Sequence, residues 1–257
     1  MVTGASSGLG LAIAKAFSQR GARVVISARR AEPLQQAAKE LGANVVPIAA
    51  DVTSQEDVEG LHEEITDHFG KLHLLCNCVG QSTRGKVLDT TVEDFQKLLE
   101  INFLAAVRTT GCFASLLLKD RGHVVNIGSL ASKLAPRFLG GYPASKFALA
   151  AYSQQLRLEL GPQGLHVLLV CPGPILRDDP TSRYDEESAD LPSAAQLPGA
   201  GAKLRGIDGD WLAKRIVTAC ERRQPELVVP WKARLLAAIS QLSPKTGDWL
   251  LRNSTGG

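Results

Sequence analysis

We predict a single α/β domain with a doubly wound parallel sheet for residues 1–257. Three observations predict this class. Short apolar runs alternate with longer stretches of helical periodicity, which is the pattern of βαβ units. Most of these apolar runs contain few polar residues, as expected of strands whose two faces are both covered by helices. A glycine-rich turn near the start of the chain opens an apolar helix, as the first turn of a doubly wound sheet does.

The first expected element is a strand, and the sequence contains only a few of its residues. Only Met1, Val2 and Thr3 precede Gly4, although a glycine turn of this kind follows a strand. That strand belongs in the middle of the sheet, where a gap leaves ladder groups unpaired. We therefore expect a truncated first strand, and we favour a shortened or misassigned start of the sequence over a natural truncation.

The following elements alternate regularly. Strands are expected at residues 24–28, 44–49, 72–78, 123–127 and 166–171, and helices at residues 9–19, 31–41, 55–69, 92–118 and 144–160. Crossovers between parallel strands are right-handed, so the order of the elements predicts helices on both faces of the sheet.

Residues 176–206 break the alternation. They follow the strand terminator Cys171-Pro172-Gly173-Pro174 and are rich in Asp, Pro, Ser, Gly and Ala, without sustained periodicity. An insert of this length is usually a lid over a site or a mobile surface segment. We expect a variable substrate loop here, and a plain surface loop is an equally good interpretation.

Residues 207–257 are expected to form a C-terminal helical segment. Apolar residues at 235, 236, 239 and 242 make one helical stripe, and Trp249 lies beyond it. The stripe fits a helix at a membrane surface or beside a substrate funnel. A helix docked on the protein's own core, or on a second subunit, is the commoner arrangement.

The composition excludes several function classes. A net charge of +3 without charged blocks argues against a nucleic-acid partner. No apolar run reaches the length of a membrane span, and the chain opens without a signal peptide. We therefore expect a cytoplasmic protein, with a membrane surface as a further location. The five cysteines are expected to be free thiols. Cys76-x-Cys78 lacks a second ligand pair, so no metal site is expected.

The glycine-rich turn is the first motif with chemical meaning. Gly4-x-x-x-Gly8-x-Gly10 allows a tight turn and close approach of a pyrophosphate to the backbone. The following helix adds free N–H groups and the positive end of its dipole. The expected cofactor-binding residues of this turn are Gly4, Ser6, Ser7, Gly8, Leu9 and Gly10.

Two arginines follow the second strand, at the position that distinguishes dinucleotides. An acidic residue there binds a ribose hydroxyl, whereas arginine accommodates a 2′-phosphate. Arg29 and Arg30 stand where no acid is present, so NADP is favoured over NAD. Asp51 and Val52, after the third strand, either contact the adenine ring or begin the next helix.

Tyr142 and Lys146 carry the strongest catalytic signal. Four residues apart on a helix, they project from one face. A neighbouring ammonium favours the phenolate, which lets a tyrosine exchange protons near neutral pH. The spacing is common by chance, and it gains weight from Asn102 and Ser129 earlier in the chain.

These segments together resemble the short-chain dehydrogenase/reductase family, over about residues 1–175. The matching segments are the Thr3–Gly10 turn, Asn77-Cys-Val-Gly80, Ile101-Asn102-Phe103, Asn126-Ile-Gly-Ser129, Tyr142-x-x-x-Lys146 and Pro172-Gly-Pro-Ile175. The resemblance implies a Rossmann fold, a nicotinamide cofactor and the catalytic residues Asn102, Ser129, Tyr142 and Lys146. It adds Asn77, Gly80, Pro172, Gly173 and Ile175, together with Tyr142 and Lys146, to the cofactor-binding residues.

The resemblance also implies a role for each catalytic residue. Tyr142 exchanges a proton with the substrate oxygen. Lys146 lowers the tyrosine pKa and holds the nicotinamide ribose. Ser129 stabilises charge on the substrate oxygen, and Asn102 holds a water that links Lys146 to solvent.

Three positions depart from the family pattern. Cys78 and Val79 replace an Asn and an Ala, which predicts the loss of a hydrogen bond that supports the sheet. Leu176 stands where a threonine that contacts the cofactor amide is common in the family.

The sequence therefore predicts an oxidoreductase that uses NADP, or with lower preference NAD, on a small ketone or secondary alcohol. The aliphatic C-terminal segment favours an apolar or lipid-like substrate. Relatives commonly form dimers or tetramers, so a homo-oligomer is expected. The alternative is a cofactor-binding scaffold or redox sensor without catalysis, which the short first strand favours. A sugar-nucleotide epimerase is disfavoured by length and by the glycine spacing.

Overall fold

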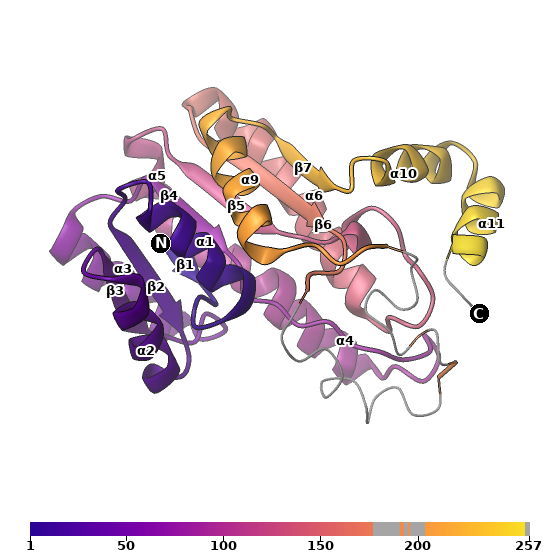
Figure 1. Ribbon diagram of the computed structural model, residues 1–257, viewed down its shortest axis with the longest axis horizontal. Coiled ribbons are helices and arrows are strands. Elements are labelled where there is room, and N and C mark those ends of the chain that lie inside the picture. The colour runs from indigo at the N-terminus through magenta and orange to yellow at the C-terminus, as the bar shows by residue number, and fades with distance from the viewer. Residues whose placement is uncertain (177–190, 193–194, 196–203, 255–257) are drawn as a thin grey trace.

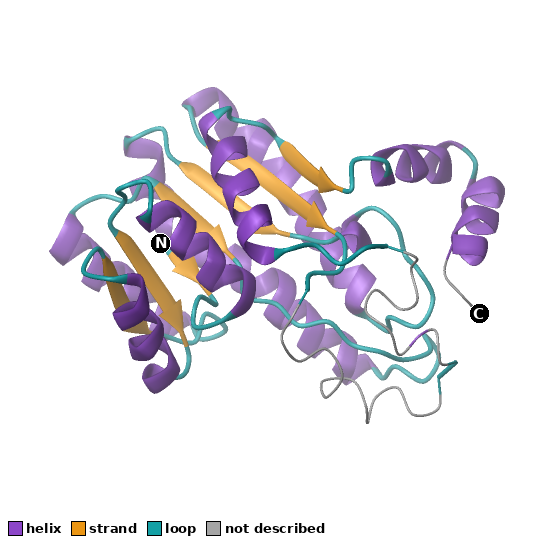
Figure 2. Ribbon diagram, viewed as in Figure 1, coloured by secondary structure: helices purple, strands orange, loops and turns teal. Residues whose placement is uncertain are grey.

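The computed structural model describes residues 1–176, 191–192, 195 and 204–254. A seven-stranded parallel sheet forms its centre, in the order β3-β2-β1-β4-β5-β6-β7 (Figure 2). The strands are β1 Val2–Thr3, β2 Val24–Ala28, β3 Val45–Ala49, β4 Leu74–Asn77, β5 His123–Ile127, β6 His166–Pro172 and β7 Glu226–Val229. The strand order changes direction between β1 and β4, which is where doubly wound sheets bind their ligands. The predicted fold class is confirmed.

The helices cover both faces of this sheet (Figure 1). They are α1 Gly8–Ser18, α2 Ala31–Leu41, α3 Gln55–Phe69, α4 Val92–Leu99, α5 Ala105–Lys119, α6 Tyr142–Leu160, α9 Gly209–Glu221, α10 Ala233–Leu242 and α11 Pro244–Ser254. Shorter turns are the π-helix η1 Glu100–Leu104 and the 3₁₀ helices η2 Leu130–Ser132 and η3 Gly161–Gln163. One apolar core lies between the sheet and α1, α2 and α9, and a second lies between the sheet and α3 and α5.

The first strand is short but central. β1 pairs in parallel with β2 through Val2 and Thr3, and with β4 through Val2. The ladder continues one residue earlier, because the Met1 nitrogen donates to the Leu74 carbonyl at 2.7 Å. The Cys76 N–H in turn donates to the Met1 carbonyl at 2.9 Å. The truncated strand that the sequence predicts is therefore present and fully engaged in the sheet.

Two boundaries differ from the prediction for physical reasons. The expected helix 92–118 is interrupted by a π-turn at η1, which shifts the helix register around Asn102. The expected helix 144–160 begins earlier, at Tyr142, because Pro143 suits the first turn of a helix.

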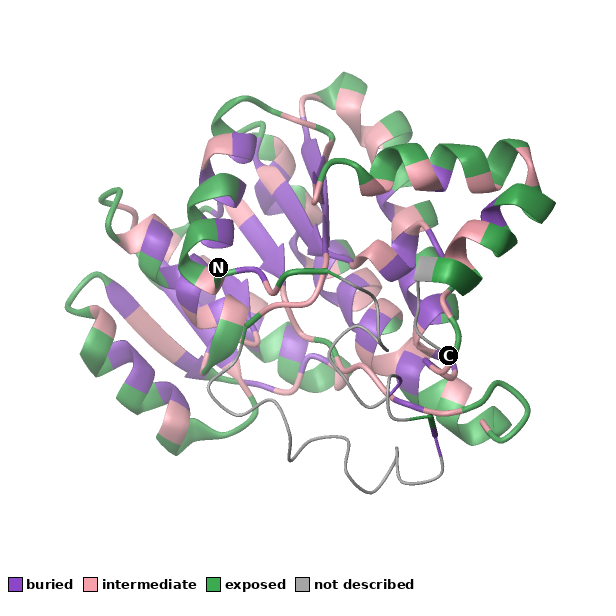
Figure 3. Cartoon of the chain, turned by 45° about the vertical axis from the view of Figure 1, so that its right-hand side comes forward, coloured by how far each residue is buried: buried purple, intermediate pink, exposed green. Residues whose placement is uncertain are grey.

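The predicted C-terminal helical segment 207–257 is more varied than expected. Its first half contains α9, which covers the sheet, and β7, which extends the sheet beside β6. β7 has only four residues, and the expectation for this region was built on helical stripes, so the strand was missed. The second half, α10 and α11, stands at the edge of the molecule (Figure 3).

Most of the predicted loop 176–206 lies outside the described residues, but its two ends are placed. Ile175 and Ile207 form a parallel bridge. The Leu176 N–H donates to the Ile207 carbonyl, and the Ile207 N–H donates to the Pro174 carbonyl, both at 2.8 Å. The segment therefore leaves and returns at one point, beside the carboxyl end of β6.

The helical run Val92–Lys119 is, within the described residues, the one helix long and apolar enough to cross a membrane by length and composition. This is weak evidence, because buried core helices meet the same criteria. Leu98, Phe113 and Leu117 of this run are buried in the protein. Packing inside the protein therefore accounts for the apolar character of these positions.

Candidate active site

The glycine-rich turn lies at the carboxyl end of β1, where α1 begins. Gly4 and Gly8 have φ angles of +65° and +56°, which side chains other than glycine rarely adopt. A Cβ atom on Gly10 would lie 2.3 Å from the Gly4 carbonyl oxygen, so only glycine fits there. Ser7 precedes α1 without a side-chain cap, which leaves the first N–H groups of the helix to a ligand. The turn fits the pyrophosphate of a dinucleotide.

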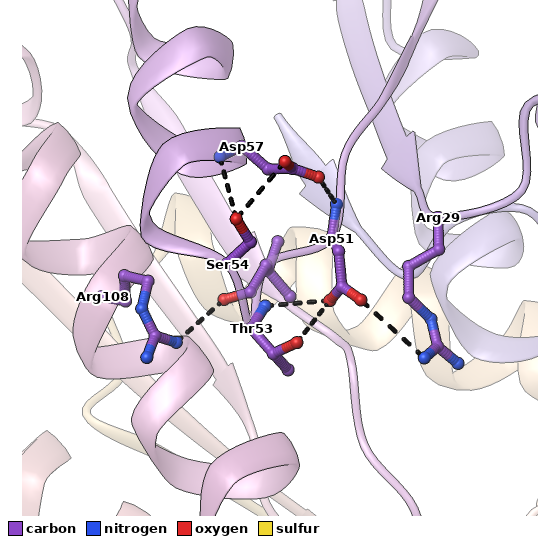
Figure 4. A network of polar contacts seen from close by, with 7 residues as sticks. Arg29, Asp51, Thr53, Ser54, Asp57 and Arg108 are labelled. Atoms are coloured by element: carbon purple, nitrogen blue, oxygen red, sulfur yellow. Dashed lines mark hydrogen bonds and ion pairs between the residues drawn. The ribbon is translucent and has the colours of Figure 1, made fainter.

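The residues expected to select the dinucleotide gather at the ends of β2 and β3 (Figure 4). Arg29 follows β2. Its side chain is 75% exposed, and its guanidinium lies 3.9 Å from an Asp51 carboxylate oxygen. Arg30 is exposed at the start of α2. Both arginines therefore stand at the carboxyl edge of the sheet, accessible to an anionic group.

Asp51 is not the cap of α3, which was one of its two interpretations. Ser54 caps that helix by accepting from the Asp57 N–H. The Asp51 carboxylate instead accepts from the Thr53 N–H and hydroxyl, at 3.0 and 2.7 Å. Partial burial alone would raise the pKa of Asp51, but these bonds and the charges of Arg29 and Arg108 outweigh it and lower the pKa. Val52 is buried beside it.

The side chains of Asn102 and Lys146 both lie close to Gly80, although Asn102 is in η1 and Lys146 is in α6. A Cβ atom on Gly80 would lie 2.9 Å from the Asn102 Oδ1 atom and 3.3 Å from the Lys146 Nζ atom. Asn102 accepts from the Gln81 N–H and donates to the Gln81 carbonyl, each at 2.8 Å. Its amide also donates to the Ser145 hydroxyl at 3.0 Å. The π-turn at η1 thus places a buried amide beside the lysine.

The Lys146 ammonium is buried at the end of β5. Its Nζ atom donates to the Ile127 carbonyl at 2.8 Å and lies 5.9 Å from the centre of the Tyr142 ring. Burial lowers the pKa of Lys146 to about 8. A lysine in this state exchanges protons near neutral pH and places a positive charge beside the tyrosine one turn away.

Ser129 follows β5 and begins η2, which packs against α6. Its hydroxyl accepts from the Ala131 N–H at 3.1 Å, and its own N–H donates to the Ser132 hydroxyl at 3.1 Å. The hydroxyl proton of Ser129 is not used in the Ala131 bond. Ser129, Tyr142 and Lys146 therefore come together from the end of β5 and the start of α6.

The side chain of Asn77 is engaged inside the protein. Its amide nitrogen donates to the side-chain Oδ1 atom of Asn126 at 2.9 Å and to the Thr110 hydroxyl at 3.0 Å. Its carbonyl oxygen accepts from the Thr109 hydroxyl at 2.8 Å. Asn126 in turn donates to the Ser153 hydroxyl. Because its side chain is already hydrogen-bonded, the main chain of Asn77 is the part that we expect to contact the cofactor.

Sheet support at the unusual Asn77-Cys78-Val79 segment comes from Thr3 as well as Asn77. The Thr3 hydroxyl donates to the Cys76 carbonyl at 3.3 Å and accepts from the Cys78 N–H at 3.1 Å. These bonds join β1 to β4, so the two strands stay linked although Cys78 stands where the family has an asparagine.

The remaining cofactor candidates lie at the end of β6. The Gly173 N–H donates to the Val229 carbonyl at 2.7 Å, which ties the loop to β7. Pro172 ends β6, and Ile175 forms the bridge that closes the base of residues 176–206. All these residues stand at the same carboxyl edge as the glycine turn.

Sequence reasoning missed one buried residue near this edge, Arg84. Its guanidinium donates to the Ala195 carbonyl at 3.1 Å and to the Thr83 carbonyl at 3.0 Å. The neighbouring Gly85 pairs with Leu139, three residues before Tyr142. Arg84 therefore links a described point of the 176–206 segment to the loop beside the tyrosine. A lone arginine in a polar loop offers no sequence signal for such a contact.

Two histidines lie at the opposite, amino edge of the sheet. His123 and His166 begin β5 and β6 and are paired in register. Their Nδ1 atoms are 2.8 Å apart. This places them away from the carboxyl edge, in agreement with a non-catalytic role.

The comparisons with known proteins agree with this architecture. The family model described as short chain dehydrogenase matches residues 1–187. An uncharacterized oxidoreductase of Staphylococcus epidermidis is 33% identical over 174 residues, which cover 67% of this chain and 76% of the relative. The NADPH-dependent 1-acyldihydroxyacetone phosphate reductase of Schizosaccharomyces pombe is 34% identical over 67% of this chain, but this match spans only 58% of the yeast protein.

Solved structures give the same result over nearly the whole chain. A short-chain dehydrogenase from Streptomyces avermitilis superposes with a TM-score of 0.81 at 27% identity, covering 96% of this chain and 95% of that one. The shared fold includes the sheet edge that carries the glycine turn, Asn102, Lys146 and Tyr142. The chain belongs to the short-chain dehydrogenase family and is an oxidoreductase that acts on CH–OH groups with a nicotinamide cofactor.

Proposed function

We propose that this protein catalyses the NADP(H)-dependent interconversion of a ketone and a secondary alcohol, with Tyr142 as the proton donor and acceptor. The observation that carries the proposal is the buried Lys146 ammonium. It lies beside the Asn102 amide over Gly80, one helical turn from Tyr142. A dehydrogenase of this kind needs a group that exchanges a proton with the substrate oxygen while hydride moves, and the bound cofactor supplies that hydride.

Each residue has a defined task in this scheme. The Lys146 charge favours removal of the proton from the Tyr142 hydroxyl, so that the tyrosine acts near neutral pH. The Ser129 hydroxyl donates to the substrate oxygen and stabilises the charge that develops on it. Asn102 holds the main chain of Gln81 and the hydroxyl of Ser145 in place near Lys146 through its hydrogen bonds.

The NADP preference rests on the exposed arginines after β2. An arginine fork matches the oxygens of a 2′-phosphate, and Asp51 lies close enough to Arg29 to orient it. The yeast relative is named as NADPH-dependent, which supports the same preference. Equal or tighter binding of NADH than of NADPH in a direct titration would contradict this part of the proposal.

An apolar or lipid-like substrate is the class we favour. The yeast relative is named as a reductase of an acylated substrate, and the segment 176–206 is anchored at both ends beside the site. A panel of ketones of increasing chain length, assayed with both cofactors, tests this. Rising kcat/KM with chain length supports the class, and a preference for short polar ketones contradicts it.

The catalytic assignment is tested with Tyr142→Phe, which removes only the hydroxyl. Turnover of any substrate found in the panel should fall by roughly 10³-fold or more, the scale expected for losing an essential proton donor. Cofactor binding, measured by NADPH fluorescence, should stay close to that of the unmodified protein. Retained turnover would show that the proton comes from another group.

A scaffold or sensor that binds NADP without catalysis is the second candidate, because the glycine turn that fits a pyrophosphate does not depend on the catalytic residues. NADPH binding without turnover across the panel would support it. A thiol-based redox response is disfavoured, because burial raises the pKa of Cys78 and of Cys171 to about 12 and so keeps these thiols protonated.

A further inference from the structure

The last two helices form a unit of their own, the C-terminal hairpin, which we define as residues 231–254. It leaves the body after β7 and stands at the edge of the molecule (Figure 1). Helix α10 packs mainly against α11, and Ala237 is its one buried residue. The attachment to the body is at the start of α10, where Ala233 touches the small core around Val228. Docking on the protein's own core is therefore limited to the first turn of α10, and the expected alternative of docking on a second subunit stays a prediction.

The hairpin is closely packed internally. A Cβ atom on Gly247 of α11 would lie 2.5 Å from the Ser240 Cα atom of α10, so the two backbones touch. Ser243 alone separates the two helices, and α11 begins at Pro244. A hydrogen bond of 2.9 Å joins the Ser243 hydroxyl to that of Thr246 in the first turn of α11. The hairpin therefore presents a defined surface.

That surface carries an apolar stripe that nothing in the described chain covers. Leu235, Ile239 and Leu242 of α10 recur every three or four residues, and at 100° per residue they fall within an arc of about 60°. Trp231 lies in the turn just before this helix and is exposed. Leu235 is 56% exposed and Leu242 87% exposed. The neighbouring helix adds Trp249, which is also mostly exposed. The hairpin therefore exposes two tryptophans and three aliphatic side chains.

The hairpin that carries this stripe is basic. The hairpin contains four basic residues and one acidic residue, a net charge of +3, equal to that of the whole chain. The basic residues are Lys232, Arg234, Lys245 and Arg252, and the acidic one is Asp248. Arg234 lies 3.6 Å from a Glu226 carboxylate oxygen of the body, which anchors the hairpin. The other three have no ion pair among the described residues.

We propose that the C-terminal hairpin docks the protein on an anionic membrane surface. Exposed tryptophans and aliphatic residues insert at the boundary between headgroups and acyl chains, while lysines and arginines contact anionic headgroups. A second copy fits the hairpin less well, because two such hairpins facing each other would bring like charges together. The charge of the hairpin matches a surface of opposite sign.

The position of the hairpin gives the docking a consequence for catalysis. It follows β7, whose Val229 carbonyl accepts from the Gly173 N–H at the cofactor edge. Binding at the hairpin therefore holds the carboxyl edge of the sheet near the bilayer, where an apolar substrate is concentrated. This consequence rests on the proposed function, whereas the docking itself does not.

The test is sedimentation of the full chain with vesicles of phosphatidylcholine alone, or of phosphatidylcholine and phosphatidylglycerol in equal parts. We expect binding to the anionic vesicles that weakens as salt increases, with a blue shift of tryptophan fluorescence. Leu235→Ser with Leu242→Ser should lower the partition coefficient more than tenfold, and so should Lys232→Glu with Lys245→Glu.

Matched controls alter the same residue types elsewhere. Leu158→Ser replaces an exposed leucine of α6, and Lys39→Glu with Lys71→Glu reverses two exposed lysines. Both controls should bind vesicles as the unmodified protein does. Tyr142→Phe should also bind equally, which separates failure of the proposed chemistry from failure of the docking.

Three results would overturn the proposal. One is absence of binding to anionic vesicles at low salt. Another is equal binding by the hairpin variants and the controls. The third is an oligomer, seen by light scattering after gel filtration, that Leu235→Ser with Leu242→Ser dissociates, because a second copy would then cover the stripe.

Discussion

Lys146 places an ionisable amine in a buried position at the candidate active site. Removing an ammonium from solvent disfavours its charged form, and the bond to the Ile127 carbonyl does not fully compensate. The protein retains this buried amine at the point where Tyr142, Ser129 and Asn102 converge. A desolvated charge at such a point is typical of catalytic sites, where pKa values are adjusted for proton transfer.

The lowered pKa of Lys146 predicts the direction in which the stability of the protein changes with pH. Between the folded pKa of about 8 and the usual value of 10.5, the unfolded chain binds a proton that the folded protein does not. Stability should therefore rise with pH across this window, by roughly 3 kcal/mol from this residue. Urea unfolding of Lys146→Met without cofactor should lack this rise, whereas Lys39→Met should keep it. Parallel curves for Lys146→Met and the unmodified protein would contradict the assignment.

Arg29 carries a separate prediction at the cofactor site. Arg29→Ala should weaken NADPH binding about tenfold or more, because a hydrogen bond to a charged group contributes roughly 1.5–3 kcal/mol. NADH lacks the 2′-phosphate, so its affinity should change little. Arg23→Ala, at the opposite end of β2, is the matched control. Fluorescence titration with both cofactors measures the outcome, and equal losses for NADPH and NADH would show that Arg29 does not contact the phosphate.

At the scale of elements, the junction of β1 and α1 depends on one close contact. The backbone of α1 approaches the Gly4 carbonyl so closely that Gly10 has no room for a Cβ atom. Gly10→Ala should shift the start of α1, destabilise the protein by about 1–3 kcal/mol and abolish NADPH binding. Gly60 of α3 provides the control, because a Cβ atom there would have no neighbour within 4 Å outside the backbone of its own helix.

Gly60→Ala should leave NADPH binding unchanged and stabilise α3 by about 0.5–1 kcal/mol, since alanine is the better helix former. Thermal unfolding and NADPH titration of the two variants distinguish a local steric effect from a general sensitivity to alanine. Normal cofactor binding by Gly10→Ala would show that the turn has a different role.

The elements also show what sequence patterns could and could not predict. Periodicity and glycine placement predicted the parallel sheet and its helices, because these depend on residues close in the chain. The π-turn at Asn102 was missed, because it is stabilised by Gln81 and Ser145, which are 21 and 43 residues away in sequence. The contact of Arg84 with Ala195 spans 111 residues and has no local signature.

At the scale of the whole molecule, the sheet has two chemically different edges. The carboxyl edge holds the glycine turn and Lys146, while the amino edge holds the pair His123 and His166. The His166 Nε2 atom donates to the Gln224 carbonyl, so in the neutral ring its Nδ1 atom accepts from His123. Burial lowers the pKa of both histidines, to about 4 for His123, where the nearby charges of His166, Arg223 and His73 add to the effect.

This pair predicts how the protein responds to acid. Because the folded pKa of His123 lies below the unfolded value of 6.5, stability should fall as pH decreases from 6.5 toward 4. His123→Leu should flatten that part of the stability curve measured by urea unfolding. His68→Leu, on the exposed surface of α3, is the control and should leave the slope unchanged. An unaltered slope in His123→Leu would mean that other groups govern acid unfolding.

The bridge between Ile175 and Ile207 has a consequence for protein engineering. Its two partners stand side by side, so the intervening stretch can be exchanged without moving β6 or α9. A replacement must keep a carbonyl acceptor for the buried Arg84, which Ala195 supplies here. The entropic cost of closing a loop grows slowly with its length. Replacement segments of different lengths should therefore be accommodated. A library that varies only this stretch could then be screened for activity on new substrates, while the catalytic residues stay unchanged.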